Sequence, residues 1–194
     1  MILPVSMLLA GYRTGFFPMA VDGGIGWFSP EQRGILPLNR LHVPKRLRRV
    51  VGQGRFEVSI DRAFDDVIRA CASRDDTNTG GNWINEEIIE SYCGLHRAGF
   101  AHSVEAWHAG ELVGGLYGVT LKGAFFGESM FHRTRDASKA ALWRLVERLR
   151  ERHYHLLDVQ WLTPHLERLG AIEIPRGRYL ELLAESMQVE CQFI

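Results

Sequence analysis

Cysteine is scarce in this chain of 194 residues, and the few cysteines form no recognisable pattern. Cys71, Cys93 and Cys191 are an odd number without C-x-x-C spacing, which argues against a disulfide framework and against a zinc site. The eight histidines are scattered rather than set at ligand spacing, and there is no G-x-S-x-G motif. We therefore expect no bound metal, no serine-hydrolase chemistry, and a reducing, cytoplasmic location.

Long apolar runs and an excess of either charge are also missing. The opening MILPVSMLLAG is too short to span a bilayer and lacks the basic residues that begin a secretory signal, so we treat it as part of the folded protein. The 23 basic residues balance the 23 acidic ones, so a polyanionic partner would have to meet a local basic patch. We expect a globular monomer with one main core and no membrane contact.

One segment, residues 34–55, contains no acidic residue at all. Its basic residues are Arg40, Lys45, Arg46, Arg48, Arg49 and Arg55. A charge run is usually a solvated face, but in a chain of zero net charge this one favours contact with a phosphate backbone. Trp83, beside a loop rich in Gly and Asn, is either a core residue or a platform on which a base stacks.

Hydrophobic periodicity predicts a mixed order of strands and helices from residue 55 onward. We expect strands at 55–60, 101–108, 111–121, 124–131, 154–160 and 171–175, and helices at 61–74, 85–99, 137–153, 163–170 and 178–186. The three central strands are joined by tight turns and indicate an antiparallel meander. This α+β order resembles that of the GNAT acyltransferases, a mixed sheet flanked by helices. We expect a small N-terminal domain over 1–33 and a GNAT-like catalytic domain over 34–194.

Two polar residues end the strand at 154–160. Asp158 and Gln160 lie two apart and so share one strand face. Asp158 could cap the following helix, but Thr163 and Pro164 already supply a helix start. Buried polar side chains without a capping role need other hydrogen bonds, so the pair is either structural or catalytic.

A carboxylate stands within the apolar stretch FFGESMF. Strand alternation predicts that Glu128 shares a face with Phe126 and Met130. The alternative is an exposed glutamate at a bulge near Gly127. If Glu128 faces a cleft, it could pair with a cationic group of a substrate.

Eight stretches together resemble the leucyl/phenylalanyl-tRNA–protein transferase family. In order they are YRTGFFPM, WFSPEQRGILPL, FEVSIDRAFDDVIRACA, WINEEIIESYCGLHRAGFAHSVEAW, LVGGLYGV, FFGESMF, ASKAAL and LDVQWLTPHLERLGAIEIPR. They cover nearly the whole chain, and GESMF and the D-x-Q strand are the specific ones. The resemblance implies an enzyme that moves Leu, Phe or Met from aminoacyl-tRNA to the N-terminal Arg or Lys of a protein, marking it for N-end rule degradation.

The resemblance also implies roles for individual residues. Asp158 and Gln160 match the catalytic pair, Trp83 matches the tryptophan that stacks on the terminal adenosine, and Met19 stands where some members have a second tryptophan. Glu128 matches an acidic residue of the active site, and Lys45, Arg46 and Arg49 fall in the region that contacts the tRNA acceptor stem. The apolar pocket for the aminoacyl side chain corresponds to Leu116, Met130, Leu142, Leu145, Leu149 and Leu157.

The implied reaction is aminolysis of an ester that is already activated, so no ATP, metal or coenzyme is expected. An α-amine has a reference pKa of about 7.7 to 8.0, so only a modest pull on its proton is needed. Our hypothesis is that the Gln160 carbonyl contacts the amine while Asp158 holds the Gln160 amide. Glu128, together with Glu105, is the candidate for the basic acceptor side chain.

Two other functions are compatible with the sequence. A GNAT-type N-acetyltransferase would place a glycine-rich, pyrophosphate-binding loop before the long helix, but the corresponding stretch FHRTRDASKAAL has no glycine. A non-catalytic tRNA-binding module would bind charged tRNA without transferring the amino acid.

Overall fold

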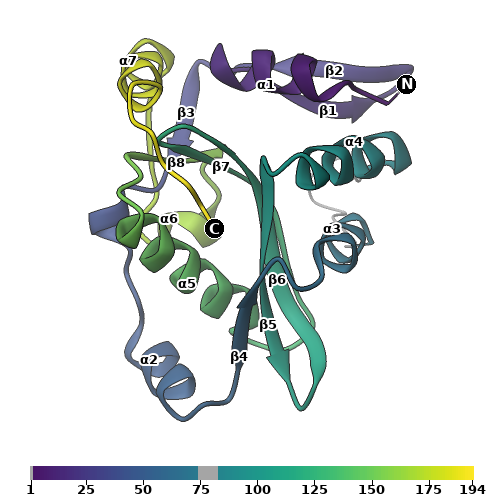
Figure 1. Ribbon diagram of the computed structural model, residues 1–194. Helices are drawn as coiled ribbons and strands as arrows, with labels where there is room; N and C mark the ends of the chain where they lie inside the picture. Colours follow the sequence, from purple (N-terminus) through teal and green to yellow (C-terminus); the bar gives the residue numbers. More distant parts are fainter. Residues whose placement is uncertain (1, 74–82) are drawn as a thin grey trace.

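A computed structural model describes residues 2–73 and 83–194 of the chain (Figure 1). The helices are α1 (Val5–Arg13), α2 (Lys45–Gly52), α3 (Phe64–Ala72), α4 (Glu86–Arg97), α5 (Ala137–Glu151), α6 (Pro164–Glu167) and α7 (Arg176–Ser186), with a 3₁₀ turn η1 (Leu38–Arg40). The strands are β1 (Phe17–Val21), β2 (Gly24–Phe28), β3 (Gln32–Ile35), β4 (Glu57–Ile60), β5 (Ala101–His108), β6 (Glu111–Leu121), β7 (Ala124–His132), β8 (Leu156–Gln160) and β9 (Ile172–Pro175).

Seven of these strands form one mixed sheet in the order β4-β5-β6-β7-β8-β3-β9. From β4 onward the order of elements is the predicted one, and β5, β6 and β7 form the predicted antiparallel meander. β7 and β8 are parallel, joined by the long helix α5. The predicted fold class, a mixed sheet flanked by helices with a separate small N-terminal part, is confirmed.

The predicted start of the second domain at residue 34 falls inside a strand. β3 begins at Gln32 and pairs with both β8 and β9 in the main sheet. Before it, α1 packs on the two-stranded sheet β1-β2, so the N-terminal part has a helix and a hairpin of its own. Short strands rich in Gly and Pro give a weak periodic signal, which explains why this hairpin was missed.

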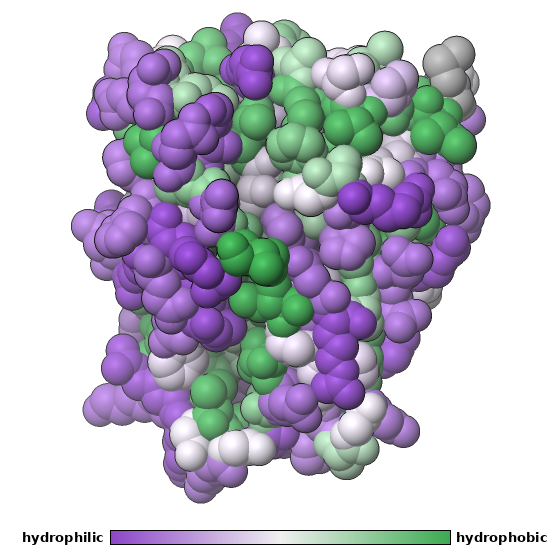
Figure 2. Space-filling view, in the orientation of Figure 1, coloured by the Kyte–Doolittle hydropathy of each residue, from purple (hydrophilic) through white to green (hydrophobic). Residues whose placement is uncertain are grey.

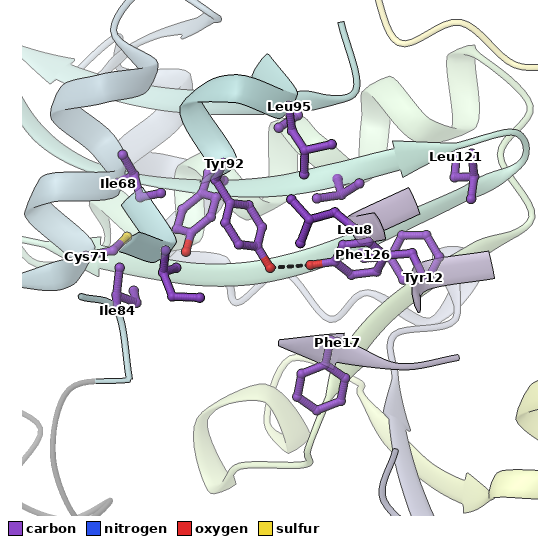
Figure 3. Packing of buried hydrophobic residues seen from close by; sticks show 14 of the residues in the cluster. Leu8, Tyr12, Phe17, Ile68, Cys71, Ile84, Tyr92, Leu95, Leu121 and Phe126 are labelled. Atoms are coloured by element: carbon purple, nitrogen blue, oxygen red, sulfur yellow. Dashed lines mark hydrogen bonds between the residues drawn. The ribbon is translucent and has the colours of Figure 1, made fainter. Parts of the chain in front are cut away.

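The sheet is covered on both faces, and each face has its own core. On one face, α3, α4 and α1 pack with residues such as Leu8, Tyr12 and Phe126, several of which appear in Figure 3. On the other face, α5 packs through an apolar stripe that includes Leu142 and Leu145. Because α1 contributes to the first core, the N-terminal part is fixed against the sheet by burial of apolar surface.

The surface view in the orientation of Figure 1 is patchy rather than uniformly polar (Figure 2). Large hydrophobic side chains that stay exposed in the described part of the chain include Ile2, Met7, Phe16 and Val21, all in the N-terminal part. Among all the residues that the structure describes, no helix is long and apolar enough to cross a membrane.

The sheet splits between β7 and β8. The two strands pair from Ala124 and Leu156 as far as Phe126 and Asp158, while β3 pairs with the other edge of β8 at Asp158 and Gln160. Glu128 is the extra residue of a bulge in β7, because Gly118 pairs with Gly127 and Tyr117 with Ser129. The bulge turns Phe126 and Met130 to opposite cores, so the predicted shared face is wrong.

The backbone of β3 approaches the end of β8 very closely at Gly34. A Cβ at this position would lie 2.7 Å from the backbone carbon of Trp161 and 2.9 Å from the amide nitrogen of Leu162. Glycine is therefore required for the contact that positions the end of β8.

We predict that Gly34→Ala destabilises the fold by about 2 kcal/mol or more, because the new methyl group overlaps backbone atoms that cannot move freely. The measurement is the free energy of unfolding in urea. Gly94→Ala is the matched control, since a Cβ at this helical position meets nothing within 4 Å. Equal effects of the two substitutions would contradict the prediction.

Candidate active site

A large cavity of about 810 Å³ opens where β7 and β8 separate. Its wall is mostly apolar and comes from β6, β7, β8, α5, α6 and the N-terminal part. Its lining residues include Phe17, Met19, Trp83, Leu116, Glu128, Met130, Leu142, Leu145, Leu157, Gln160 and Trp161. An apolar cavity with a few convergent polar groups is the usual form of a small-molecule site.

Asp158 lies behind this cavity rather than in it. Its side chain is completely buried, and its carboxylate accepts hydrogen bonds from the Arg33 guanidinium at 3.0 and 2.7 Å. The Tyr179 hydroxyl donates to the same carboxylate at 2.7 Å, and the backbone N–H of Gln160 donates at 2.9 Å. Four donors saturate the carboxylate, so its charge is compensated within the protein.

Arg33 is the partner that the sequence analysis did not identify. Its guanidinium is stacked between the rings of Phe17 and Tyr179, with centroids 4.6 and 4.5 Å from Cζ. It also donates to the Gly15 carbonyl at 3.2 Å. Burial by itself would lower the pKa of Arg33, but the facing Asp158 carboxylate outweighs that effect and the pKa is raised. A lone arginine before the apolar run GILPL was the available signal.

Gln160 ends β8 in a conformation that is uncommon for its residue type. Its φ is +58°, in the left-handed region, and its side chain is 5% exposed. Such a residue costs about 1 to 3 kcal/mol unless its surroundings hold it. The hydrogen bond from the Gln160 backbone N–H to the Asp158 carboxylate, two residues earlier, closes a local turn that holds Gln160 in this conformation.

The Gln160 side chain is oriented by Glu128. Its side-chain amide nitrogen donates a hydrogen bond to the Glu128 carboxylate at 3.1 Å. The carbonyl oxygen of the same side-chain amide remains as a hydrogen-bond acceptor. The expectation that Asp158 holds the Gln160 amide is therefore wrong, because Asp158 bonds the backbone of Gln160 instead.

Two tyrosines complete the surroundings of Glu128. The hydroxyls of Tyr12 and Tyr92 lie 2.8 and 3.0 Å from its two carboxylate oxygens and are also in direct contact with each other (Figure 3). Burial raises the pKa of Glu128 from its usual 4.5 to about 8, against the lowering effect of the hydrogen bonds from these hydroxyls. Neither tyrosine was predicted as a site residue, although both lie in stretches that carry the family resemblance.

Most of the predicted pocket residues lie at the cavity. Leu116, Met130, Leu142, Leu145 and Leu157 line it. Leu149 does not line the cavity. This residue lies on α5 one turn beyond Leu145, and its side chain is completely buried in the core between α5 and the sheet.

The residues predicted to contact nucleic acid lie in two separate places. Trp83 and Met19 both line the cavity on the side of the N-terminal part, where the Ala20 N–H donates to the Trp83 carbonyl at 3.0 Å. Lys45, Arg46 and Arg49 are exposed on α2, which packs near the start of α5.

Glu105 does not lie at the cavity, so its prediction as an acceptor-binding residue is wrong. It is completely buried and accepts hydrogen bonds from the hydroxyls of Ser59 and Ser103.

Within residues 2–73 and 83–194, no group of three or more His, Cys, Asp or Glu side chains is placed to hold a metal ion.

Comparisons with known proteins place the chain in a family. Residues 35–184 match the family "Leucyl/phenylalanyl-tRNA protein transferase", and residues 1–31 match its N-terminal domain. A protein of Rubrobacter xylanophilus named leucyl/phenylalanyl-tRNA–protein transferase is 54% identical, over 100% of both chains. One of the same name from Herpetosiphon aurantiacus is 50% identical over 98% of each chain.

A solved structure of a ribosomal-protein-alanine N-acetyltransferase from Brucella melitensis is also similar, with a TM-score of 0.40 and 15% identity. The match covers 58% of this chain and 84% of that one. The full-length matches at half identity, together with the D-x-Q strand and the GESMF strand on the two sides of the cavity, decide the assignment. The chain belongs to the leucyl/phenylalanyl-tRNA–protein transferase family.

Proposed function

We propose that this enzyme transfers Leu, Phe or Met from aminoacyl-tRNA to the N-terminal Arg or Lys of a protein, which marks that protein for degradation by the N-end rule. The observation that carries the proposal is the apolar cavity with the Gln160 amide held at its wall. Charged tRNA is a cytoplasmic substrate, so a cytoplasmic location remains our prediction, as does a monomeric state.

The reaction replaces the ester C–O bond by a C–N bond, and the released ribose hydroxyl takes a proton that the attacking amine gives up. The amine must be neutral and aligned with the ester carbonyl. Because the Gln160 amide nitrogen is bonded to Glu128, its carbonyl can accept a hydrogen bond from the amine without itself changing charge. Asp158 is buried and saturated, so its role is to position Gln160 rather than to take the proton.

The cavity walls supply the recognition of the aminoacyl-adenosine end. Leu116, Met130, Leu142, Leu145 and Leu157 form an apolar pocket that would take a Leu, Phe or Met side chain. A difference of one methylene changes the binding free energy in such a pocket by only about 1 to 3 kcal/mol. We therefore expect the enzyme to transfer all three amino acids at measurable rates. Trp83 and Met19 are at hand for stacking on the terminal base.

The acceptor protein would be recognised at Glu128. This is the carboxyl group among the cavity-lining residues, and it lies next to the Gln160 amide. A cationic Arg or Lys side chain bonded to Glu128 would bring the adjoining α-amine to Gln160.

The acetyltransferase alternative is disfavoured at the start of α5. The residue preceding this helix is Asp136, a buried carboxylate that pairs with Arg46 at 3.2 Å and Lys139 at 3.4 Å. The Asp136 side chain occupies this helix terminus, and the stretch before the helix has no glycine whose backbone could cradle a pyrophosphate. A tRNA-binding module without activity does not account for the oriented, strained Gln160.

The decisive assay mixes labelled Phe-tRNA with a peptide that begins with Arg and measures label bound to the peptide. A peptide beginning with Ala is the control. We expect transfer to the Arg peptide alone. Equal labelling of the two peptides, or labelling of neither, would refute the proposed function.

We predict that Gln160→Ala lowers kcat by about a hundredfold, because the amine is no longer aligned with the ester. The Kd for aminoacyl-tRNA should stay unchanged, because the tRNA and the aminoacyl side chain are bound by other residues. Single-turnover transfer and filter binding measure the two quantities. A variant that keeps full turnover would remove Gln160 from the mechanism.

We predict that Lys45→Ala and Arg49→Ala each weaken aminoacyl-tRNA binding and reduce the slope of log K against log salt by about one. Both side chains are exposed on α2, and the substitutions leave the buried residues of that helix in place. Arg178→Ala, at an exposed site on α7, is the control. An unchanged salt slope in both α2 variants would exclude α2 from the tRNA contact.

A further inference from the structure

Three oxygen-bearing groups meet at one side of the cavity in a closed arrangement. Glu128 Oε1 faces the Tyr12 hydroxyl at 2.8 Å, and Oε2 faces the Tyr92 hydroxyl at 3.0 Å. The two hydroxyls also contact each other. Tyr12, Tyr92 and Glu128, here called the Tyr–Glu ring, therefore share three hydrogen-bonding contacts.

The number of available protons decides the charge of this ring. Each phenol carries one proton, so an ionised Glu128 leaves two protons for three contacts. One contact would then set lone pair against lone pair in a buried site, which is costly. A proton on Glu128 supplies the third donor: Oε2 donates to Tyr92, Tyr92 to Tyr12, and Tyr12 to Oε1.

The groups around the ring agree with a neutral carboxyl. Asp158 is the nearest other acid and opposes a second negative charge, while Arg33, the nearby cation, is already bonded to Asp158 at both of that residue's oxygens. Tyr117 adds a further buried phenol next to Tyr92. Among the described residues, no basic side chain comes within salt-bridge distance of Glu128.

We propose that Tyr12 and Tyr92 are positioning residues of the acceptor site that hold Glu128 as a neutral acid in the free enzyme, and that a cationic acceptor displaces this proton when it binds. The second half of the inference rests on the proposed function, whereas the first half does not. Glu128 Oε1 is then a carbonyl oxygen, free to accept from both Tyr12 and the Gln160 amide.

A neutral Glu128 has a consequence for specificity. An uncharged N-terminal side chain meets a neutral, hydrogen-bonded ring and gains no ion pair. Arg or Lys gains a charge-assisted bond, but only by expelling the proton, so binding of the acceptor is coupled to the release of one proton. Acceptor affinity should thus rise with pH until Glu128 is ionised in the free enzyme.

The pH dependence of the unfolding constant tests the protonation state of Glu128 directly. Above pH 4.5 the unfolded chain loses the Glu128 proton while the folded protein keeps it until about pH 8, so unfolding releases a proton in this window. The ratio of the unfolding constant of the wild type to that of Glu128→Gln should therefore rise by about tenfold per pH unit within it. Glu111→Gln, at the exposed start of β6, controls for the loss of one charge.

A ratio for Glu128→Gln that does not change between pH 5 and pH 8 would overturn the proposal. The protonation state can also be measured in the wild-type protein by NMR. With ¹³C-labelled glutamate carboxyls, one carboxyl carbon should keep the chemical shift of a protonated acid at pH 7. A spectrum in which every glutamate is ionised at that pH would also overturn it.

The coupling to the acceptor is measured with a peptide that begins with Nα-acetyl-arginine, which keeps the guanidinium but has no α-amine to titrate. Its inhibition constant in the transfer assay should fall by about tenfold from pH 6.5 to 7.5. Tyr92→Phe and Tyr12→Phe each remove two of the three contacts of the ring and should lower kcat by at least about fivefold. An inhibition constant independent of pH would overturn the coupling. Failure of Arg peptides to accept label refutes the proposed function instead, while the unfolding ratio still decides the proton on Glu128.

Discussion

The buried ion pair between Arg33 and Asp158 is the interaction on which the rest of the site depends. Arg33 comes from β3, Asp158 from β8, and the two rings that enclose the guanidinium come from β1 and α7. Asp158 then fixes the backbone of Gln160 at a positive φ. One ion pair thus connects the N-terminal part, the C-terminal helix and the residue that faces the substrate. A buried pair of this kind is valuable for geometry rather than for net stability.

The split between β7 and β8 supplies the space that this geometry needs. The bulge at Glu128 and the turn at Gln160 lie on the two sides of the opening, and they bring a carboxyl and an amide from different strands into contact. Helix α5 closes the opening from one face with leucines. Polar groups are thereby placed at one wall of an apolar cavity, where hydrogen bonds are stronger than in water.

Much of the fold could be predicted from the sequence because long elements carry strong periodic signals. The meander and helix α5 are examples, as is α6, where Thr163 caps the helix and Pro164 occupies its first turn. The resemblance to the family identified Asp158, Gln160 and Glu128. Arg33, Tyr12, Tyr92 and Tyr179 could not be placed, because their side-chain hydrogen-bond partners are 21 to 146 residues away in the chain. Local pattern gives no information on such contacts. The bulge that reverses the face of Met130 did have a local signal, since Gly127 made a bulge the alternative to a regular strand.

The most direct measurement separates the two roles of the ion pair with Arg33→Met, Asp158→Leu and the double variant. Each single variant leaves a buried charge without its partner and should lose about 3 to 5 kcal/mol of stability, while the apolar pair should recover most of it. Turnover should stay low in the stable double variant, because the Gln160 N–H has lost the acceptor that fixes it. A double variant with wild-type turnover would contradict the positioning role of Asp158.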